Sequence, residues 1–160
     1  MIDGCCAWLK KVHNLGTNNA AWMAKRSVGK GGEEDSPEAY LKAAEEYVAE
    51  MFAGKKAGIK PIYDALLELG LGVGTDVKAC PCKTMVPLFR HHVFAQIKPA
   101  TLTRIDMGYA LKDTEATGRL IDTGGFAKKD RITHRIPITE MDEIDAEVKH
   151  WLQVAHEMDK

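Results

Sequence analysis

The chain has 160 residues and a formal net charge of −1, with 45% hydrophobic and 28% charged residues. These ordinary values exclude an intrinsically disordered chain and a polycation that coats nucleic acid along its whole length. The length fits one domain with an appendage, or two very small domains.

The N-terminal part predicts a short helical segment followed by a linker. Two helical patterns, at about residues 3–13 and 18–27, are interrupted by helix-breaking residues between them. The stretch SVGKGGEED, residues 27–35, is Gly-rich and charged and lacks the spacing of a phosphate-binding loop, so we expect a linker there. We therefore expect a helical segment over 1–30 and a separate domain over 36–160.

Two longer helices are expected next. Ser36 as the N-cap and Pro37 at the first helical position begin a helix that Gly54 ends. A further helix covers about residues 61–70. In both, apolar side chains recur at helical spacing, so each helix has one face to bury in a core.

From about residue 76 the hydrophobic period changes from 3.6 to 2, which predicts β-strands. We expect strands near 77–81, 84–90, 92–99, 102–110, 118–122 and 131–138, with a hairpin turn at Pro99-Ala100-Thr101. Thr139 is then expected to cap a long final helix. This order predicts an α+β fold: an antiparallel sheet of about five strands, flanked by N-terminal helices and a long C-terminal helix.

Basic residues are concentrated in the strand-forming part. Residues 78–137 contain 11 Lys and Arg against 5 Asp and Glu, whereas the segments on either side are acidic. Alternation along the strands would place six side chains on a sheet face that no helix covers: Phe94, Gln96, Lys98, Arg104, Arg131 and Arg135. Two interpretations stay open, an ordinary solvated face or a site where basic side chains around an aromatic ring meet an anionic partner such as nucleic acid.

Eight residues make up the candidate set for binding an anion or a nucleic acid: Lys83, Arg90, Phe94, Lys98, Arg104, Arg119, His134 and Arg135. His134 lies in an apolar row, so it is either a core histidine with one hydrogen bond or a functional histidine in a pocket under the sheet. The sequence shows no Ser/His/Asp set, no paired carboxylates and no nucleotide loop, and DTGG at 122–125 predicts a polar turn. We predict a non-enzymatic binding module with no catalytic residues and no cofactor.

The stretch CPCKTMVPLFRHH, residues 80–92, is a candidate metal site. Cys80 and Cys82 point the same way in a strand, whereas the adjacent His91 and His92 point to opposite faces. At most three ligands can then converge, fewer than the four of a structural zinc site. We predict no bound metal, and metal binding or delivery through the cysteines and one histidine is kept as an alternative function.

The cysteine pattern and the lack of a long apolar run predict the cellular location of the protein. Two tight cysteine pairs do not resemble a secreted disulfide framework, and no segment reads as a signal peptide or membrane span. We expect a cytoplasmic protein without a membrane partner. A homodimer is a further alternative, because exposed strand edges and N-terminal tryptophans could pair between copies.

Four stretches carry a family resemblance: KTMVPLFRHHVFAQIKPATLTRIDMGYAL, GRL at 118–120, THRI at 133–136 and EIDAEVKHWLQVAHE. With them, the chain from about residue 61 resembles the family known as domain of unknown function 5655. WLKKVHNLGTNNA, within residues 8–30, resembles part of domain of unknown function 4287, which often accompanies that family. The resemblance implies no established activity, and the frequent position of the family beside other domains, nuclease-like ones among them, favours binding over catalysis.

Overall fold

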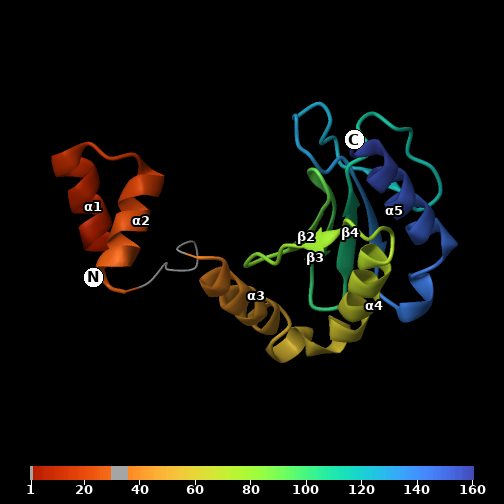
Figure 1. Ribbon diagram of the computed structural model, residues 1–160, viewed down its shortest axis with the longest axis horizontal. Coiled ribbons are helices and arrows are strands. Elements are labelled where there is room, and N and C mark those ends of the chain that lie inside the picture. The colour runs from red at the N-terminus through yellow and green to blue at the C-terminus, as the bar shows by residue number, and fades with distance from the viewer. Residues whose placement is uncertain (1, 30–35) are drawn as a thin grey trace. The chain divides into compact units, whose positions relative to one another are not determined.

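The computed structural model describes residues 2–29 and 36–160 and is drawn in Figure 1. The chain divides into two compact units, residues 1–43 and 44–160, and the division falls inside helix α3 (Pro37–Met51). Part of the predicted linker, residues 30–35, lies outside the described residues. Each unit has a hydrophobic core of its own.

The N-terminal unit contains a helical hairpin of α1 (Ile2–His13) and α2 (Thr17–Ser27). Its small core consists of Leu9, Ala20 and Ala24. The two alanines lie four residues apart on one face of α2, so the helices approach closely. Trp8 and Trp22 are 54% and 49% exposed, so the largest side chains of this unit are only partly buried.

The helices that follow begin and end as local sequence requires. The Ala39 N–H donates to Ser36 Oγ at 3.1 Å, which confirms Ser36 as the N-cap of α3. After α3, Gly54 adopts a left-handed conformation (φ +59°) that glycine tolerates best, and the 3-10 helix η1 (Gly54–Ile59) follows. Helix α4 (Lys60–Leu71) then carries a proline in its first turn.

A single antiparallel sheet forms the centre of the second unit. Its strands are β1 (Lys78–Ala79), β2 (Val86–Phe89), β3 (Val93–Pro99), β4 (Ile105–Tyr109), β5 (Ile121–Asp122) and β6 (His134–Ile138). They lie in the order β1-β2-β3-β4-β6-β5, and each neighbouring pair is antiparallel. The predicted α+β class is confirmed, with six strands where about five were expected.

The C-terminal helix begins later than its sequence pattern indicated. A short 3-10 helix, η2 (Met141–Glu143), precedes α5 (Ala146–Met158), and Asp145 caps α5 by accepting hydrogen bonds from two N–H groups in its first turn. Thr139 is therefore not the cap of this helix. Its N–H donates instead to Glu143 Oε2, which closes the turn that leads into η2.

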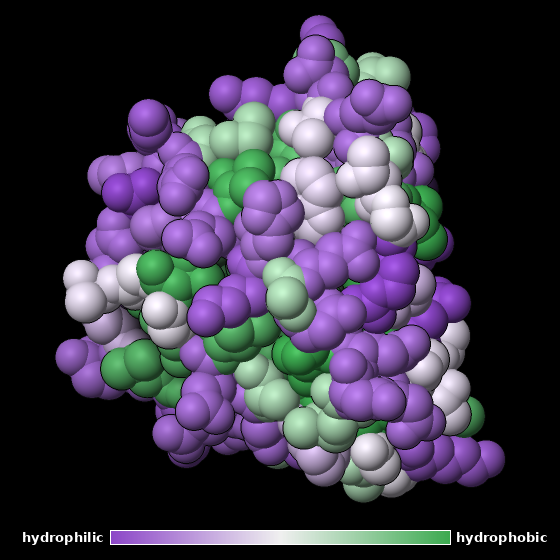
Figure 2. All heavy atoms as spheres, turned by 90° about the vertical axis from the view of Figure 1, so that its right-hand side faces the viewer, coloured by the Kyte–Doolittle hydropathy of each residue, from purple (hydrophilic) through white to green (hydrophobic). Residues whose placement is uncertain are grey.

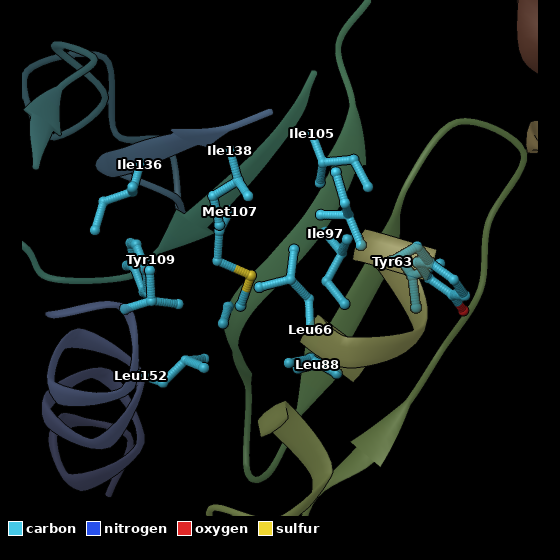
Figure 3. Packing of buried hydrophobic residues seen from close by; sticks show 14 of the residues in the cluster. Tyr63, Leu66, Leu88, Ile97, Ile105, Met107, Tyr109, Ile136, Ile138 and Leu152 are labelled. Carbon is cyan, nitrogen blue, oxygen red and sulfur yellow. The ribbon is translucent and has the colours of Figure 1, made fainter. Parts of the chain in front are cut away.

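Helices α4 and α5 cover one face of the sheet (Figure 1) and enclose the core. Figure 3 shows side chains of both helices meeting those of the strands. Fully buried members include Leu66 of α4, Leu152 of α5 and, from the strands, Ile97, Met107 and Ile136. Burying each such side chain contributes about 1.5–3 kcal/mol, so this contact holds the helices on the sheet.

The outer surface of the helical side is mixed in character. Figure 2 views the side on the right of Figure 1 and shows hydrophobic side chains in small groups among hydrophilic ones. Within the residues that the structure describes, no helix has the length and apolar character needed to cross a bilayer.

Candidate anion-binding site

The face of the sheet opposite α4 and α5 carries the polar side chains of the central strands. The register pairs Lys98 with Asp106, and Gln96 with Gly108, which in turn pairs with Arg135. Because directly paired residues project to the same face, these side chains share one surface. The strand residues that alternate with them are buried under the helices. Lys98 and Arg135 thus project outward, as alternation predicted.

Asp106 neutralises much of the positive charge on this face. Its side chain is 10% exposed, with Oδ1 at 2.9 Å from Arg104 Nε and Oδ2 at 2.5 Å from Arg135 Nη1. The Arg104 contact lacks hydrogen-bond alignment, and Arg135 Nε has no hydrogen-bond partner among the described residues. Two guanidinium groups around one carboxylate leave a single excess positive charge. The guanidinium groups of Arg104 and Arg135 are therefore already paired with Asp106, which makes them less available to an external anion.

A pocket of about 570 Å³ opens where β3 ends. Four lysines line it: Lys55 and Lys56 of η1, Lys83 of the segment before β2, and Lys98 of β3. Among the described residues that line the pocket, Glu50 is the one with a carboxylate. We call this site the lysine pocket. Its four ammonium groups and single carboxylate make it strongly electropositive.

The lysines are held at the pocket by different local structures. Gly54 turns the chain after α3, so that Lys56 Nζ comes within 3.5 Å of the Pro99 carbonyl oxygen. Lys83 Nζ lies 5.6 Å from the centroid of the Tyr47 ring, a cation–π distance. Like charges that line one pocket repel one another, and a bound anion relieves that repulsion.

A second, smaller pocket of about 300 Å³ continues from Lys98 across the outer face. Its lining residues are Gln96, Lys98, Asp106, Gly108, Thr123, Asp130, Ile132 and Arg135. We call it the sheet pocket. A Cβ at Gly108 would lie 2.8 Å from Ile132 Cγ2 and 2.9 Å from Gln96 Cγ, so the glycine allows these two side chains to cross the strand.

Arg90, another predicted binding residue, instead fastens the C-terminal segment. Its Nε donates to Asp76 Oδ2 at 2.5 Å, and its Nη1 donates to the carbonyl oxygens of His156 and Asp159 at 3.0 and 3.3 Å. Hydrogen bonds from His156 and Arg90 lower the pKa of Asp76 to about 2. The guanidinium is thus part of the fold's own polar network.

Arg119 has a similar structural role at the start of α5. Its Nη2 contacts Asp145 Oδ1 at 2.9 Å and donates to the Glu143 carbonyl oxygen at 2.8 Å. Its Nε lies 3.2 Å from Glu147 Oε2. The arginine therefore joins the loop before β5 to the first turn of the helix.

The outward position predicted for Phe94 is wrong. The side chain is fully buried, and its ring meets the His156 ring edge-on with centroids 5.4 Å apart. The pairing of β2 with β3 shifts between Leu88 and Phe89, so Phe94 has no partner in β2. Such an irregularity breaks the alternation on which the prediction rested.

His134 lies within the core, 1% exposed. Its Nε2 is 2.8 Å from the Thr114 carbonyl oxygen and therefore carries the proton, and its Nδ1 is 2.8 Å from Thr133 Oγ1. Thr133 Oγ1 also accepts from the Leu111 N–H at 3.0 Å. Both ring nitrogens are thus engaged in holding the loop after β4 against β6, and the core interpretation of this histidine fits the geometry.

The structure does not bring the cysteines and histidines of residues 80–92 together. Cys82 Sγ contacts the Cys80 carbonyl oxygen at 3.5 Å, whereas His92 Nδ1 lies 3.0 Å from Asp159 Oδ1. Over residues 2–29 and 36–160, no group of three or more His, Cys, Asp or Glu side chains is placed to hold a metal ion.

Two lining residues of the lysine pocket, Lys55 and Lys56, were missing from the predicted set. They lie in a segment, 33–77, with 4 basic and 10 acidic residues, so the regional charge count concealed them. The signal was the Lys pair directly after Gly54, the residue predicted to end the helix. What joins them to Lys98 is the tertiary structure.

Comparison with known proteins places the second unit in a family. Searches of curated proteins and of solved structures returned no match to the chain. The family model described as Domain of unknown function (DUF5655) matches residues 48–159, which include the sheet, α4, α5 and the lysine pocket. The match covers more than half of the chain, and the protein therefore belongs to the DUF5655 family.

Proposed function

We propose that this protein is a non-enzymatic binding module whose lysine pocket takes a phosphate-bearing anion, with nucleic acid as the leading class of partner. The observation that carries the proposal is the convergence of four lysines from three segments on one pocket with a single carboxylate. Lysine binds phosphate as a compact point charge, and several ammonium groups around one concavity favour a polyanion over a single carboxylate.

The proposal narrows the original set of eight residues. Lys83 and Lys98 line the pocket, whereas the four arginines bind protein carboxylates or carbonyl groups, and Phe94 and His134 are buried. The arginines therefore support the site by ordering the surrounding structure. We place the protein in the cytoplasm as part of this proposal, because all four cysteines are free.

The test is isothermal titration calorimetry with short-chain inorganic polyphosphate, which gives the binding constant K at low and at raised salt concentration. We expect the triple variant Lys55→Gln/Lys56→Gln/Lys98→Gln to lose most of the affinity. The slope of log K against log salt concentration should become shallower by about 2, because each lost phosphate contact removes about 0.7–0.9 from the slope.

The matched control is Lys128→Gln/Lys149→Gln/Lys160→Gln, which removes the same charge from residues that do not line the lysine pocket. Equal loss in both triple variants would show that net charge, and no particular pocket, governs binding. A wild-type protein with no affinity for polyphosphate at low salt would refute the proposal.

Self-association is a second candidate function, favoured by the half-exposed tryptophans of the N-terminal unit. Trp8 and Trp22 expose about half of their surface although indole rings are usually largely buried. Sedimentation velocity of the wild type and of Trp8→Ser/Trp22→Ser tests it: a concentration-dependent dimer lost in the variant is expected, and a monomer at all concentrations contradicts it. We also propose, on the resemblance alone, that residues 8–30 derive from a domain of unknown function 4287.

A further inference from the structure

A third pocket, of about 570 Å³, lies at the opposite end of the central strands from the lysine pocket. Its lining includes Ala110, which follows β4, Thr133, which precedes β6, and side chains of the segment 126–131. It shares Asp130 with the sheet pocket, which shares Lys98 with the lysine pocket. We call the third site the aromatic pocket. The three pockets thus follow one another along the strands.

Basic residues line all three pockets of the series. Eight basic side chains line the three pockets: Lys55, Lys56, Lys83, Lys98, Lys112, Lys129, Arg131 and Arg135. Four carboxylates accompany them: Glu50, Asp106, Asp130 and Asp159. Two of the four already bind arginine, Asp106 as described above and Asp159 through Arg131 Nη2 at 2.6 Å. Taken together, the series is therefore net positive, with the largest excess in the lysine pocket, a smaller one in the aromatic pocket, and a balance of basic and acidic residues in the sheet pocket.

The aromatic pocket presents an exposed phenylalanine ring. Phe126 is 54% exposed, the highest fraction among the large apolar side chains described in the second unit. The turn that carries it is closed by backbone hydrogen bonds, from Lys129 N to Phe126 O at 3.1 Å and from Asp130 N to Gly125 O at 2.9 Å. A Cβ at Gly125 would lie 2.5 Å from the Ile132 carbonyl oxygen, so this turn packs tightly on the chain behind it.

Two lysines of the aromatic pocket have a left-handed backbone conformation. Lys112 and Lys129, which line the same pocket, have φ angles of +56° and +61°. Lysine rarely adopts this left-handed conformation, and strained residues of this kind are concentrated at binding sites. An exposed ring and two lysines that line the same pocket suit a ligand that is both aromatic and anionic.

Resting on the proposed function, we infer that the partner is a single-stranded nucleic acid, whose strand follows the three pockets with its phosphates bound in the lysine pocket and one of its bases stacked on Phe126. The seven residues of β3 extend roughly 20 Å, a span suited to a few nucleotides. A positive groove with an aromatic stacking platform is the usual arrangement for single strands. Only an unpaired base has a face free to cover the ring, so a duplex does not satisfy both contacts.

The test is fluorescence anisotropy with a labelled oligothymidylate, an abasic oligonucleotide of equal length and a duplex. We expect Phe126→Ala to weaken binding of the oligothymidylate by about 5- to 150-fold, the range for one stacked base. It should leave abasic and polyphosphate binding unchanged, and Phe126→Trp should retain wild-type affinity. Phe89→Ala is the matched control, because Phe89 is also exposed (37%) and lines none of the three pockets.

The outcomes separate this inference from the proposed function. If Phe126→Ala binds oligothymidylate as the wild type does while the lysine triple variant loses affinity, the stacking inference fails and the anion pocket stands. Duplex binding as tight as single-strand binding also overturns the inference. Failure of the wild type to bind any of the phosphate probes refutes the proposed function as well.

Discussion

Replacing Asp159 should destabilise the second unit, because this carboxylate fixes the connection between β2 and β3. Asp159 is 2% exposed and accepts hydrogen bonds from the N–H groups of His91 and His92 at 3.0 and 2.8 Å. His92 Nδ1 at 3.0 Å and Arg131 Nη2 at 2.6 Å complete its surroundings. The change Asp159→Ala leaves these groups without their acceptor.

The expected cost follows from how buried each contact is. A hydrogen bond to a charged group contributes about 1.5–3 kcal/mol. The side chains of His92 and Arg131 are 62% and 47% exposed, so water screens and replaces most of their contribution. The two backbone N–H bonds count more fully, and such contributions are not additive. We therefore expect Asp159→Ala to lower the free energy of unfolding by about 3 kcal/mol.

The assay is urea unfolding followed by the fluorescence of Trp151, which lies on α5 and packs against the core. A Trp8→Phe/Trp22→Phe background leaves Trp151 as the only tryptophan, so the signal reports on the second unit. Asp130→Ala is the control, since Asp130 is exposed and its side chain makes no hydrogen bond to the described part of the chain. A difference between the two variants below about 1 kcal/mol would refute the reasoning.

The contribution of Asp159 should also depend on pH. Burial acts to raise the pKa of this carboxyl, but hydrogen bonds from His92 and His91 and the charge of Arg131 outweigh it and hold the pKa below its ordinary value. A carboxyl with a lowered folded-state pKa stabilises the protein above its unfolded-state pKa of about 3.9. The stability difference between wild type and Asp159→Asn should therefore be complete near neutral pH and vanish as the pH falls through the folded-state pKa. A difference that is constant with pH would contradict this.

Three further changes test the packing. Leu66→Ala, at a fully buried position between α4 and the sheet, should lower the free energy of unfolding by about 2–5 kcal/mol in urea titrations, and a loss below 1 kcal/mol would contradict the packing described. Tyr109→Phe should be neutral or stabilising by about 1 kcal/mol in thermal unfolding, because the buried hydroxyl has no hydrogen-bond partner among the described residues; a clear loss would refute this. Gly125→Ala should speed amide exchange in the turn that carries Phe126, since its Cβ would meet backbone atoms; unchanged exchange would count against the tight packing.

The sequence predicted the secondary structure well because each element is set by local signals. The Ser36-Pro37 start, the glycine at 54 and the change of period near residue 76 all act within a few residues. The error at the C-terminal helix has a different cause. Both Thr139 and Asp145 are good caps by residue type, and Arg119, more than twenty residues away, binds Asp145 and Glu147 at the observed start.

At the candidate site, the prediction from strand alternation was also correct where local pattern decides the structure and wrong where a tertiary feature does. It placed Lys98, Arg104 and Arg135 on the outward face because side chains alternate wherever pairing is regular. It failed at Phe94, where the register with β2 shifts. Register depends on both strands, so the sequence of one strand does not reveal such a shift.

The sequence by itself determined the order of elements, the α+β class and the concentration of basic residues in the sheet region, because these depend on local period and composition. Only the tertiary structure decided which cations remain available. Asp106 holds two of the predicted arginines, whereas Lys55 and Lys56 of an acidic segment join Lys98 at the end of β3. Ion pairing and pocket formation depend on distances between segments remote in the chain, which residue type and spacing do not specify.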